Sequence, residues 1–168
     1  MLSGDRVTLR PVEPGDAPFL DVLFAIPSIA EAWPGDNDGR LATAVETGVV
    51  GLIVEAPVDD GAQAIGFIQY AEEHDPNYRS ASIDIVLHPD WCNRGLGTDA
   101  VRTLARHLFD EVGHHRITID PRSTNLRAIA SYRKVGFRDV GVMRQYEKDN
   151  EGAWHDALLM DLLRDELA

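Results

Sequence analysis

A glycine loop between a strand-like and a helix-like segment is the part of this chain that most clearly suggests chemistry. Residues 82–87 alternate with a period of two, and apolar residues within 98–112 recur at three- and four-residue steps. Between these segments, Gly95 and Gly97 let a ligand approach the main chain. The first N–H groups of a helix favour negative charge, so the loop predicts an anion site. On this pattern alone, a plain tight turn is an equally good interpretation.

Two well-known phosphate motifs differ from this loop. A Walker loop continues with Lys and then Ser or Thr after its last glycine, whereas Gly97 is followed by Thr98 and Asp99. A dinucleotide fingerprint finds its third small residue in Ala100, but it also needs an acidic residue ending a strand about twenty residues later. Asp120 is the nearest candidate and does not fit that distance cleanly. The loop is therefore of another kind.

The composition predicts one domain spanning residues 1–168. The chain has 168 residues with 44% apolar content, which is enough for a single core. No apolar run approaches the roughly 18 residues of a membrane helix, and no basic segment followed by an apolar one begins the chain. One cysteine, Cys92, excludes an internal disulfide and a multi-cysteine metal site, and the six histidines show no metal-ligand spacing. We expect a cytoplasmic protein without a membrane segment or a bound metal.

The charge of the chain limits its partners. There are 28 acidic and 16 basic residues, giving a formal net charge of −12. A nucleic-acid-binding protein needs a basic face, so nucleic acid is not an expected partner. The acidic balance is compatible with a cationic substrate, but solubility or adaptation to a saline host explains it equally well.

The periodicities along the chain predict an α/β (α+β) fold with a mixed central sheet of about six to seven strands and about four helices. Asp16 is a candidate cap for the first helix, and a short second helix is expected near Leu41. The early strands are joined by turns, as in hairpins, and the later ones alternate with helices. The expected strands cover residues 7–10, 49–55, 64–70, 82–87, 115–120, 137–142 and 157–162, and the longer helices cover 98–112 and 125–135.

A second motif lies after the strand that ends at Asp120. Residues 125–137 read N-x-x-A-x-x-x-Y-x-x-x-G-F. Together with the glycine loop, this motif resembles the Gcn5-related N-acetyltransferase (GNAT) superfamily. The resemblance implies that acetyl-coenzyme A is the acyl donor, that the loop holds its pyrophosphate, and that the second helix flanks its pantetheine and thiol.

A narrower resemblance points to the aminoglycoside 6'-N-acetyltransferases of the resistance type. It does not extend beyond about Met143, so the tail can contact something different. The family usually has Gln or Arg where this chain has Cys92, and we interpret Cys92 as a silent loop residue rather than a reactive thiol. The segments that carry the match are residues 7–10, 29–33, 65–67, 83–84, 95–98, 120–121, 123 and 125–129.

The resemblance also implies which residues hold the donor. The main chain of the glycine loop would bind pyrophosphate, and two residues of the preceding strand would pair with the pantetheine amides by extending the sheet. Asn125 would contact coenzyme A or cap its own helix, and both roles are compatible. The expected donor-binding residues are Val86, Leu87, Arg94, Gly95, Leu96, Gly97, Thr98, Asn125 and Ala128.

Three side chains are candidates for catalysis and amine binding. Asp84 lies inside an apolar strand, where a carboxylate must be paired or serve a site, and we expect it to accept the proton of the attacking ammonium. Tyr132 is the candidate acid for the departing thiolate, with simple aromatic packing as the alternative. Asp120 is expected to anchor another amine of the substrate, although it can instead cap the turn before Pro121.

Three more residues are expected at the mouth of the site. Trp33 offers a ring face to a sugar or ammonium group, or it pins its loop to the core. Glu72 and Glu73 follow a strand and would add negative potential; a solvated charged turn is the equally plain alternative.

We therefore expect an acetyl-coenzyme A-dependent N-acetyltransferase whose acceptor is a cationic amine, the 6'-amino group of an aminoglycoside. The first alternative is a GNAT enzyme acting on protein N-termini or on a small metabolite amine. The second, of another class, is a non-catalytic acyl-coenzyme A sensor, which the presence of both Asp84 and Tyr132 disfavours. The chain would act as a monomer or a homodimer.

Overall fold

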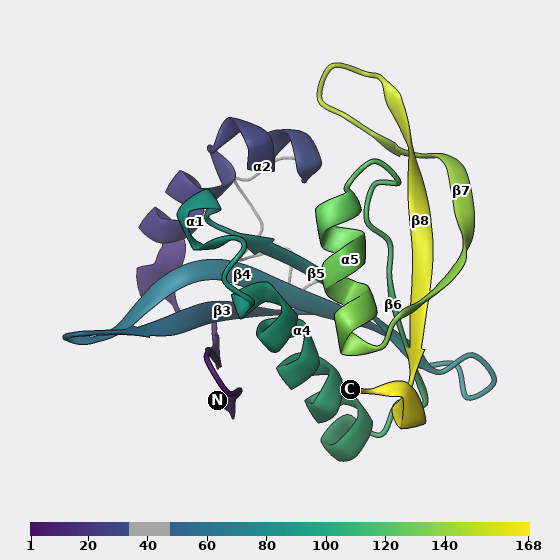
Figure 1. Ribbon diagram of the computed structural model, residues 1–168, viewed down its shortest axis with the longest axis horizontal. Helices are drawn as coiled ribbons and strands as arrows, with labels where there is room; N and C mark the ends of the chain where they lie inside the picture. Colours follow the sequence, from purple (N-terminus) through teal and green to yellow (C-terminus); the bar gives the residue numbers. More distant parts are fainter. Residues whose placement is uncertain (34–47) are drawn as a thin grey trace.

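One sheet of eight strands runs through the computed structural model, which describes residues 1–33 and 48–168 (Figure 1). The strand order is β1-β2-β3-β4-β5-β6-β8-β7, one strand more than the upper limit expected from the sequence. The additional strand, β1, has only two residues. The strands are β1 (Leu2–Ser3), β2 (Thr8–Pro11), β3 (Val49–Val58), β4 (Gly61–Glu73), β5 (Ser80–Leu87), β6 (Arg116–Ile119), β7 (Arg138–Lys148) and β8 (Trp154–Leu163).

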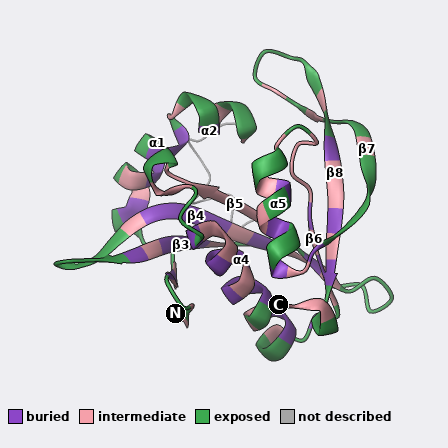
Figure 2. Ribbon diagram, viewed as in Figure 1, coloured by how far each residue is buried: buried purple, intermediate pink, exposed green. Residues whose placement is uncertain are grey.

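The helices cover both faces of this sheet. Helices α4 (Leu96–His107) and α5 (Leu126–Val135) pack on one face, while α1 (Ala17–Phe24) and α2 (Pro27–Ala32) pack on the other. Each face has its own buried apolar cluster, and the buried stretches of strands and helices face each other between the layers (Figure 2). The mixed α/β fold expected from the sequence is confirmed. The short helix expected near Leu41 lies outside the described residues.

The sheet opens between β5 and β6. All the other strand pairs are antiparallel, whereas β5 and β6 are parallel and share only the pairs Ala81↔Ile117 and Ser82↔Thr118. Beyond Ser82, β5 continues to Leu87 along β4 alone. The main-chain groups on the β6 side of this stretch therefore face an opening in the sheet.

The period of two in β5 places its residues as the sequence predicts. Ile83 is buried in the cluster under α4 and α5, and Ile85 and Leu87 pack against that cluster. Val86 packs against the opposite cluster, beside α1 and α2. Because side chains alternate between faces, Asp84 lies on the α1 and α2 face with Val86.

Helix α4 forms because one of its sides is apolar along its length. Ala100, Val101, Leu104 and Ala105 are fully buried. The helix begins at Leu96, two residues before the expected start, and a π-helical turn at Leu108–Val112 continues it to the expected end.

Helix α5 is closed at both ends by its own sequence. The Asn125 side chain accepts a hydrogen bond from the Ala128 N–H at 3.1 Å, which is an N-cap. At the other end Gly136 has a φ of +117°, and an added Cβ would lie 2.1 Å from the Glu166 carbonyl oxygen. Glycine is therefore required at this C-terminus, as the motif predicts.

The expected role of Asp16 as the cap of α1 is wrong. Asp16 makes no capping hydrogen bond to that helix. Both of its carboxylate oxygens instead accept from the Arg10 guanidinium at 2.7 Å, and the Glu13 N–H also donates to it. The hydrogen bond from Arg10 holds the pKa of Asp16 below its usual range. The carboxylate thus ties the start of α1 to β2, a contact that local sequence does not reveal.

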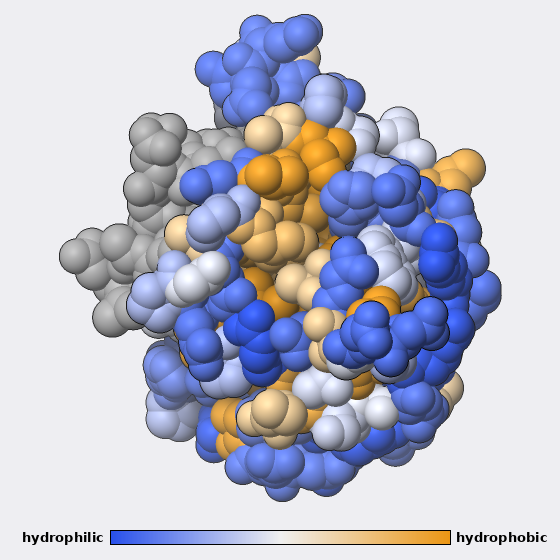
Figure 3. Space-filling model, turned by 90° about the vertical axis from the view of Figure 1, so that its left-hand side faces the viewer, coloured by the Kyte–Doolittle hydropathy of each residue, from blue (hydrophilic) through white to orange (hydrophobic). Residues whose placement is uncertain are grey.

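The side of the molecule formed by α1 and the β3–β4 hairpin is not uniformly polar. In Figure 3 this side faces the viewer, and apolar side chains form a band among hydrophilic ones.

Within residues 1–33 and 48–168, no helix combines the length and apolar character needed to cross a membrane.

Candidate active site

A cavity of about 1130 Å³ lies where β5 and β6 separate. Its walls come from α2 and Trp33, the end of β5, the glycine loop, the residues after β6, helix α5 and strand β7. Small-molecule pockets usually have volumes of about 300–1,000 Å³, so this one is large enough for an elongated ligand and a second molecule. The motifs singled out in the sequence thus meet at one place.

The glycine loop carries the start of α4 to this cavity. Asn93 and Gly95 both have left-handed backbone conformations, with φ of +61° and +79°. Gly95 is the N-cap of α4, so the N–H groups of the first turn are free of partners within the helix. An added Cβ at Gly97 would lie 3.3 Å from a methyl carbon of Leu87, so glycine also lets the helix approach β5 closely. These features fit a pyrophosphate group.

A hydroxyl pair links the first turn of α4 to α5. The side-chain oxygens of Thr98 and Ser131 lie 2.7 Å apart, and both residues line the cavity. Sequence reasoning identified Thr98 but missed Ser131, because its hydroxyl lies inside a helical motif with no separate signal. The pair fixes the distance between the helices that flank the expected donor.

The loop residues do not all face the cavity. Gly95, Gly97 and Thr98 line it, as does Asn93, which was not among the predicted residues. Leu96 is buried in the core beneath the loop, and the Arg94 guanidinium lies over the Trp91 ring, 5.1 Å from its centroid. Because the side chains of Leu96 and Arg94 are engaged elsewhere, these two residues can contact a ligand only through their main chains.

Cys92 is a partly buried loop residue that lines the cavity. Its sulfur lies 3.8 Å from the His88 carbonyl oxygen and 4.0 Å from that of Leu87. A thiol is a weak donor, so these contacts support the interpretation of Cys92 as a packed, silent residue.

The open edge of β5 offers main-chain groups in a fixed order. The His88 N–H donates to the Ile65 carbonyl at 2.8 Å, and the register of β4 and β5 continues without a bulge through the Val86 pair. In an antiparallel ladder the bonding direction alternates, so the Val86 main chain faces β4 and those of Ile85 and Leu87 face the opening. The Leu87 main chain thus lies where its predicted role requires, whereas the Val86 main chain does not. Ile85, whose main chain also faces the opening, was not among the predicted residues.

Asn125 and Ala128 line the cavity at the start of α5. The capping bond occupies the Ala128 N–H, so only the methyl group of Ala128 is available to a ligand. Asn125 caps its helix, as one of its two expected roles requires.

Two carboxylates and a phenol line the part of the cavity where an amine acceptor is expected, which we call the acceptor side. Asp84, Asp120 and Tyr132 all line it. Burial raises the pKa of Tyr132 above its usual range, and the nearby charges of Asp84 and Asp120 raise it further. The phenol is protonated at neutral pH, as an ordinary tyrosine is, and the shift makes it a weaker acid. The Gln69 side-chain amide donates to the Asp84 carboxylate at 3.0 Å, a contact that sequence reasoning missed.

Tyr146 is a further member of this group that the sequence did not reveal. Its hydroxyl hydrogen-bonds to Asp120, and this bond is the main cause that raises the pKa of Tyr146 to about 12. The pairing of β7 with β8 shifts register between Met143 and Glu147, and Gln145 has a φ of +50°. This irregularity breaks the period of two, which is the signal that would have placed Tyr146 on a face.

Glu72 and Glu73 do not fit their predicted place at the mouth. They are not among the residues that line the cavity, and Glu72 pairs with Ala81 at the opposite end of β5 from Leu87. The Glu72 carboxylate lies 2.8 Å from the ring nitrogen of His114, which is buried. Antiparallel pairing explains the error, because the end of β4 lies beside the start of β5.

Trp33 packs on the core and also lies in the cavity wall. Its ring makes edge contacts with Phe24 and Phe67, with centroids 5.7 and 6.1 Å apart, so it is anchored to the core. It also lines the cavity and is only partly buried.

Within the described residues, no group of three His, Cys, Asp or Glu side chains is placed to hold a metal ion.

The comparisons with known proteins agree with this geometry. Residues 6–138 match the family model for the acetyltransferase (GNAT) domain. The chain therefore belongs to the GNAT family of acetyltransferases, and it is an N-acetyltransferase that uses acetyl-coenzyme A.

Individual relatives differ in the acceptors that they are named for. The chain is 29% identical to aminoglycoside N(6')-acetyltransferase type 1 of Klebsiella pneumoniae in an alignment 158 positions long, which covers 84% of this chain and 78% of that protein. It is 34% identical to the ribosomal protein bS18-alanine N-acetyltransferase of Escherichia coli over 82 residues, 47% of this chain and 52% of that protein.

Solved structures match over nearly the whole of this chain. The complex of AAC(6')-Ib with acetyl-coenzyme A matches with a TM-score of 0.77 and 27% identity, covering 96% of both chains. RimJ of Mycobacterium smegmatis, in complex with a coenzyme A disulfide, matches with a TM-score of 0.81 and 27% identity, covering 96% of this chain and 83% of that one. The family is thus established, and these relatives do not share one acceptor.

Proposed function

We propose that this protein transfers the acetyl group of acetyl-coenzyme A to the 6'-amino group of an aminoglycoside. The observation that carries the proposal is the meeting of Asp84 and Asp120 beside Tyr132 in a cavity that also reaches the start of α4. Two carboxylates suit a substrate with several ammonium groups, because one can accept a proton while the other holds a second amine. The similarity to the Klebsiella pneumoniae enzyme over most of the chain supports this acceptor.

The residues divide the reaction between the two sides of the cavity. When bound, acetyl-coenzyme A supplies a thioester, whose carbonyl carbon is open to attack by an amine. The start of α4 holds its pyrophosphate, and the Leu87 N–H at the open edge of β5 polarises the thioester carbonyl.

The remaining side chains transfer protons or hold the acceptor. Asp84 accepts a proton from the substrate ammonium, directly or through water, so that the neutral amine can form the new C–N bond. Tyr132 gives its proton to the sulfur as the C–S bond breaks, and Asp120 anchors another amine of the acceptor. The Tyr132 phenol is protonated at neutral pH, so it carries the proton that this step needs.

A second candidate acceptor is the N-terminal amine of a protein. The similarity to the bS18-alanine N-acetyltransferase over 82 residues favours it. This acceptor has one amine near the reacting centre, so it gives Asp120 no evident partner.

One experiment tests these acceptors against each other. The purified protein is incubated with acetyl-coenzyme A and, separately, with kanamycin, spermidine and a peptide with N-terminal alanine, and release of free thiol is followed. Rapid release with kanamycin, and a product acetylated at the 6'-amino group by mass spectrometry and NMR, supports the proposal. Release with the peptide or with spermidine, and none with kanamycin, overturns it.

A further inference from the structure

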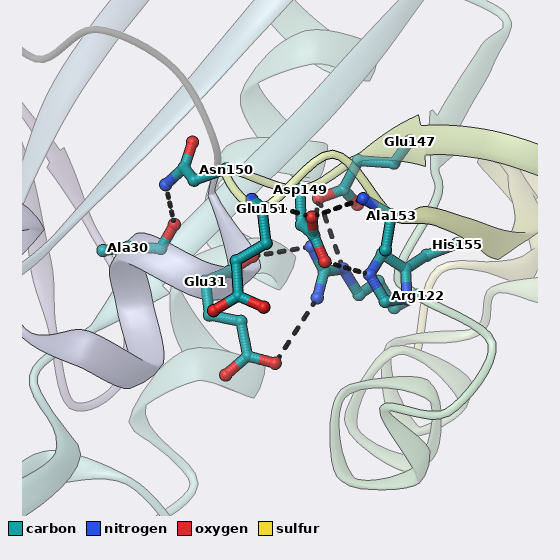
Figure 4. A network of polar contacts seen from close by, with 9 residues as sticks. All are labelled: Ala30, Glu31, Arg122, Glu147, Asp149, Asn150, Glu151, Ala153 and His155. Carbon is teal, nitrogen blue, oxygen red and sulfur yellow. Dashed lines mark hydrogen bonds and ion pairs between the residues drawn. The ribbon is translucent and has the colours of Figure 1, made fainter.

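We propose that Arg122 is a positioning residue, which fastens α2 to the β7–β8 hairpin and thereby fixes the width of the acceptor side of the cavity. Arg122 follows β6 and is itself part of the cavity wall. The inference rests on the acetyltransferase site proposed above, and only the choice of assay substrate depends on the aminoglycoside. Figure 4 shows the contacts that carry it.

The Arg122 guanidinium contacts both sides of the opening. It donates to the Glu147 carboxylate on β7 at 2.8 and 3.2 Å. It also donates to the main-chain carbonyl of Glu31 on α2 at 2.6 Å, and the Glu31 carboxylate lies 3.8 Å away. Only 11% of the Arg122 side chain is exposed, so water competes weakly for these bonds.

A second hydrogen bond connects α2 to the turn of the β7–β8 hairpin. The Asn150 side-chain amide donates to the Ala30 carbonyl at 3.1 Å. The turn that carries Asn150 is held by Asp149, whose carboxylate accepts from the N–H groups of Glu151 and Ala153 and from His155. Two side chains far along the sequence therefore bind consecutive carbonyls of α2.

Helix α2 depends on such contacts. It has six residues, too few for a helix to be stable in water alone. The last carbonyls of any helix have no partner within it, and those of Ala30 and Glu31 are satisfied by Asn150 and Arg122. The same helix carries Ser28, Ile29 and Ala32 into the cavity wall and leads directly to Trp33. The bonds that hold the end of α2 therefore also hold this part of the cavity wall in place.

The charges around Arg122 explain why an arginine is suited to this position. Glu31 and Glu147 contact it directly, while Asp120 lies two residues before it and Asp149 is engaged by His155. The planar guanidinium can reach α2 and β7 simultaneously, which a single ammonium group cannot do. Arg122 also keeps the Glu147 carboxylate paired, so this acid does not compete for the acceptor's amines.

The first test measures the Michaelis constants of both substrates. Arg122→Gln should raise the KM of the acceptor by about tenfold, because binding must then also order α2. The KM of acetyl-coenzyme A should stay within about twofold, since the α4 side is unchanged. Arg122→Lys keeps the charge beside Glu147 but cannot contact α2 and β7 together. We therefore expect the same result from it, a raised KM of the acceptor and an unchanged KM of acetyl-coenzyme A. The matched control is Arg116→Gln, which removes the 2.9 Å ion pair of Arg116 with Asp161 elsewhere in the sheet.

The second test needs no acceptor. Hydrogen exchange of the α2 amides in the free enzyme should accelerate in Arg122→Gln and in Asn150→Ala, and remain unchanged in Arg116→Gln. Unchanged exchange in α2, or an equal rise of both Michaelis constants, overturns the positioning role. If kanamycin is not acetylated but exchange still accelerates, the proposed acceptor fails while the inference about Arg122 stands.

Discussion

Gln69 donates a hydrogen bond to the Asp84 carboxylate at 3.0 Å, and the two residues are direct partners in the register of β4 and β5. Their side chains lie on the α1 and α2 face of the sheet, toward the acceptor side of the cavity. The sheet itself therefore sets the orientation of the proposed base. A base fixed in this way does not have to be ordered by the substrate.

Replacing this base should abolish most of the turnover. In Asp84→Asn we expect kcat to fall by about 10²-fold or more, the range of general base catalysis, because the amide cannot accept the ammonium proton. Gln69→Leu should reduce kcat less, since the carboxylate stays but loses its orientation. Steady-state kinetics and calorimetric binding of coenzyme A check both variants. Glu73→Gln, outside the cavity, is the control, and unchanged turnover in Asp84→Asn would rule out the assignment.

The phenol of Tyr132 should make the stability of the protein sensitive to alkali. Its folded-state pKa lies above the unfolded value of about 10, so the stabilising contribution is complete below about pH 10. As the pH rises further, the unfolded chain loses its proton first, and the free energy of unfolding falls. Urea titrations from about pH 8 to about pH 11 should show a shallower fall in Tyr132→Phe than in the wild type. Equal slopes would contradict a buried, protonated phenol.

Local sequence was sufficient for the elements at which we propose that the donor binds. The loop with Gly95 and Gly97, the cap at Asn125 and the closing Gly136 are encoded by neighbours in the chain, and the period of two placed Asp84 on the correct face. These features depend on backbone conformation and on helix ends, which a few adjacent residues determine.

The acceptor side depends on register and on distant contacts, which local sequence does not contain. Gln69 meets Asp84 through strand pairing, and Tyr146 reaches Asp120 because β7 is irregular. Arg122 bonds to Glu31, 91 positions away. The predicted place of Glu72 failed for the same reason, since antiparallel pairing carries it to the far end of β5.

Loss of the hydroxyl pair between α4 and α5 should weaken the binding of acetyl-coenzyme A and leave acceptor binding unchanged. In Thr98→Val the 2.7 Å contact with Ser131 is lost, and the first turn of α4 is less firmly placed beside α5. We expect the KM of acetyl-coenzyme A to rise by about three- to tenfold, the cost of one hydrogen bond. Initial rates at varied donor concentration measure this change. If the pair acts as a unit, Ser131→Ala adds little to Thr98→Val, whereas full additivity would show that the two hydroxyls work separately.

The contact of Arg10 with Asp16 should stabilise the fold in a manner that acid removes. Because the folded-state pKa of Asp16 is lowered, its contribution is present above the unfolded value of about 3.9 and disappears as the pH falls through the folded value. Asp16→Asn should cost about 1–3 kcal/mol near neutral pH, and the difference from the wild type should shrink below about pH 4. Denaturant unfolding at several pH values checks this. A difference that does not change with pH would mean that packing, and not charge, is responsible.

Tyr146 should affect acceptor binding through Asp120. Its hydroxyl hydrogen-bonds to the Asp120 carboxylate, and its pKa of about 12 keeps it protonated under assay conditions. Tyr146→Phe removes this donor and leaves the ring, so we expect the KM of the acceptor to rise about three- to tenfold with the donor KM unchanged. Tyr78→Phe, at an exposed residue outside the cavity, is the matched control. If Asp120 only closes the turn before Pro121, Tyr146→Phe will lower thermal stability and leave both Michaelis constants unchanged, and Asp120 will not be an amine anchor.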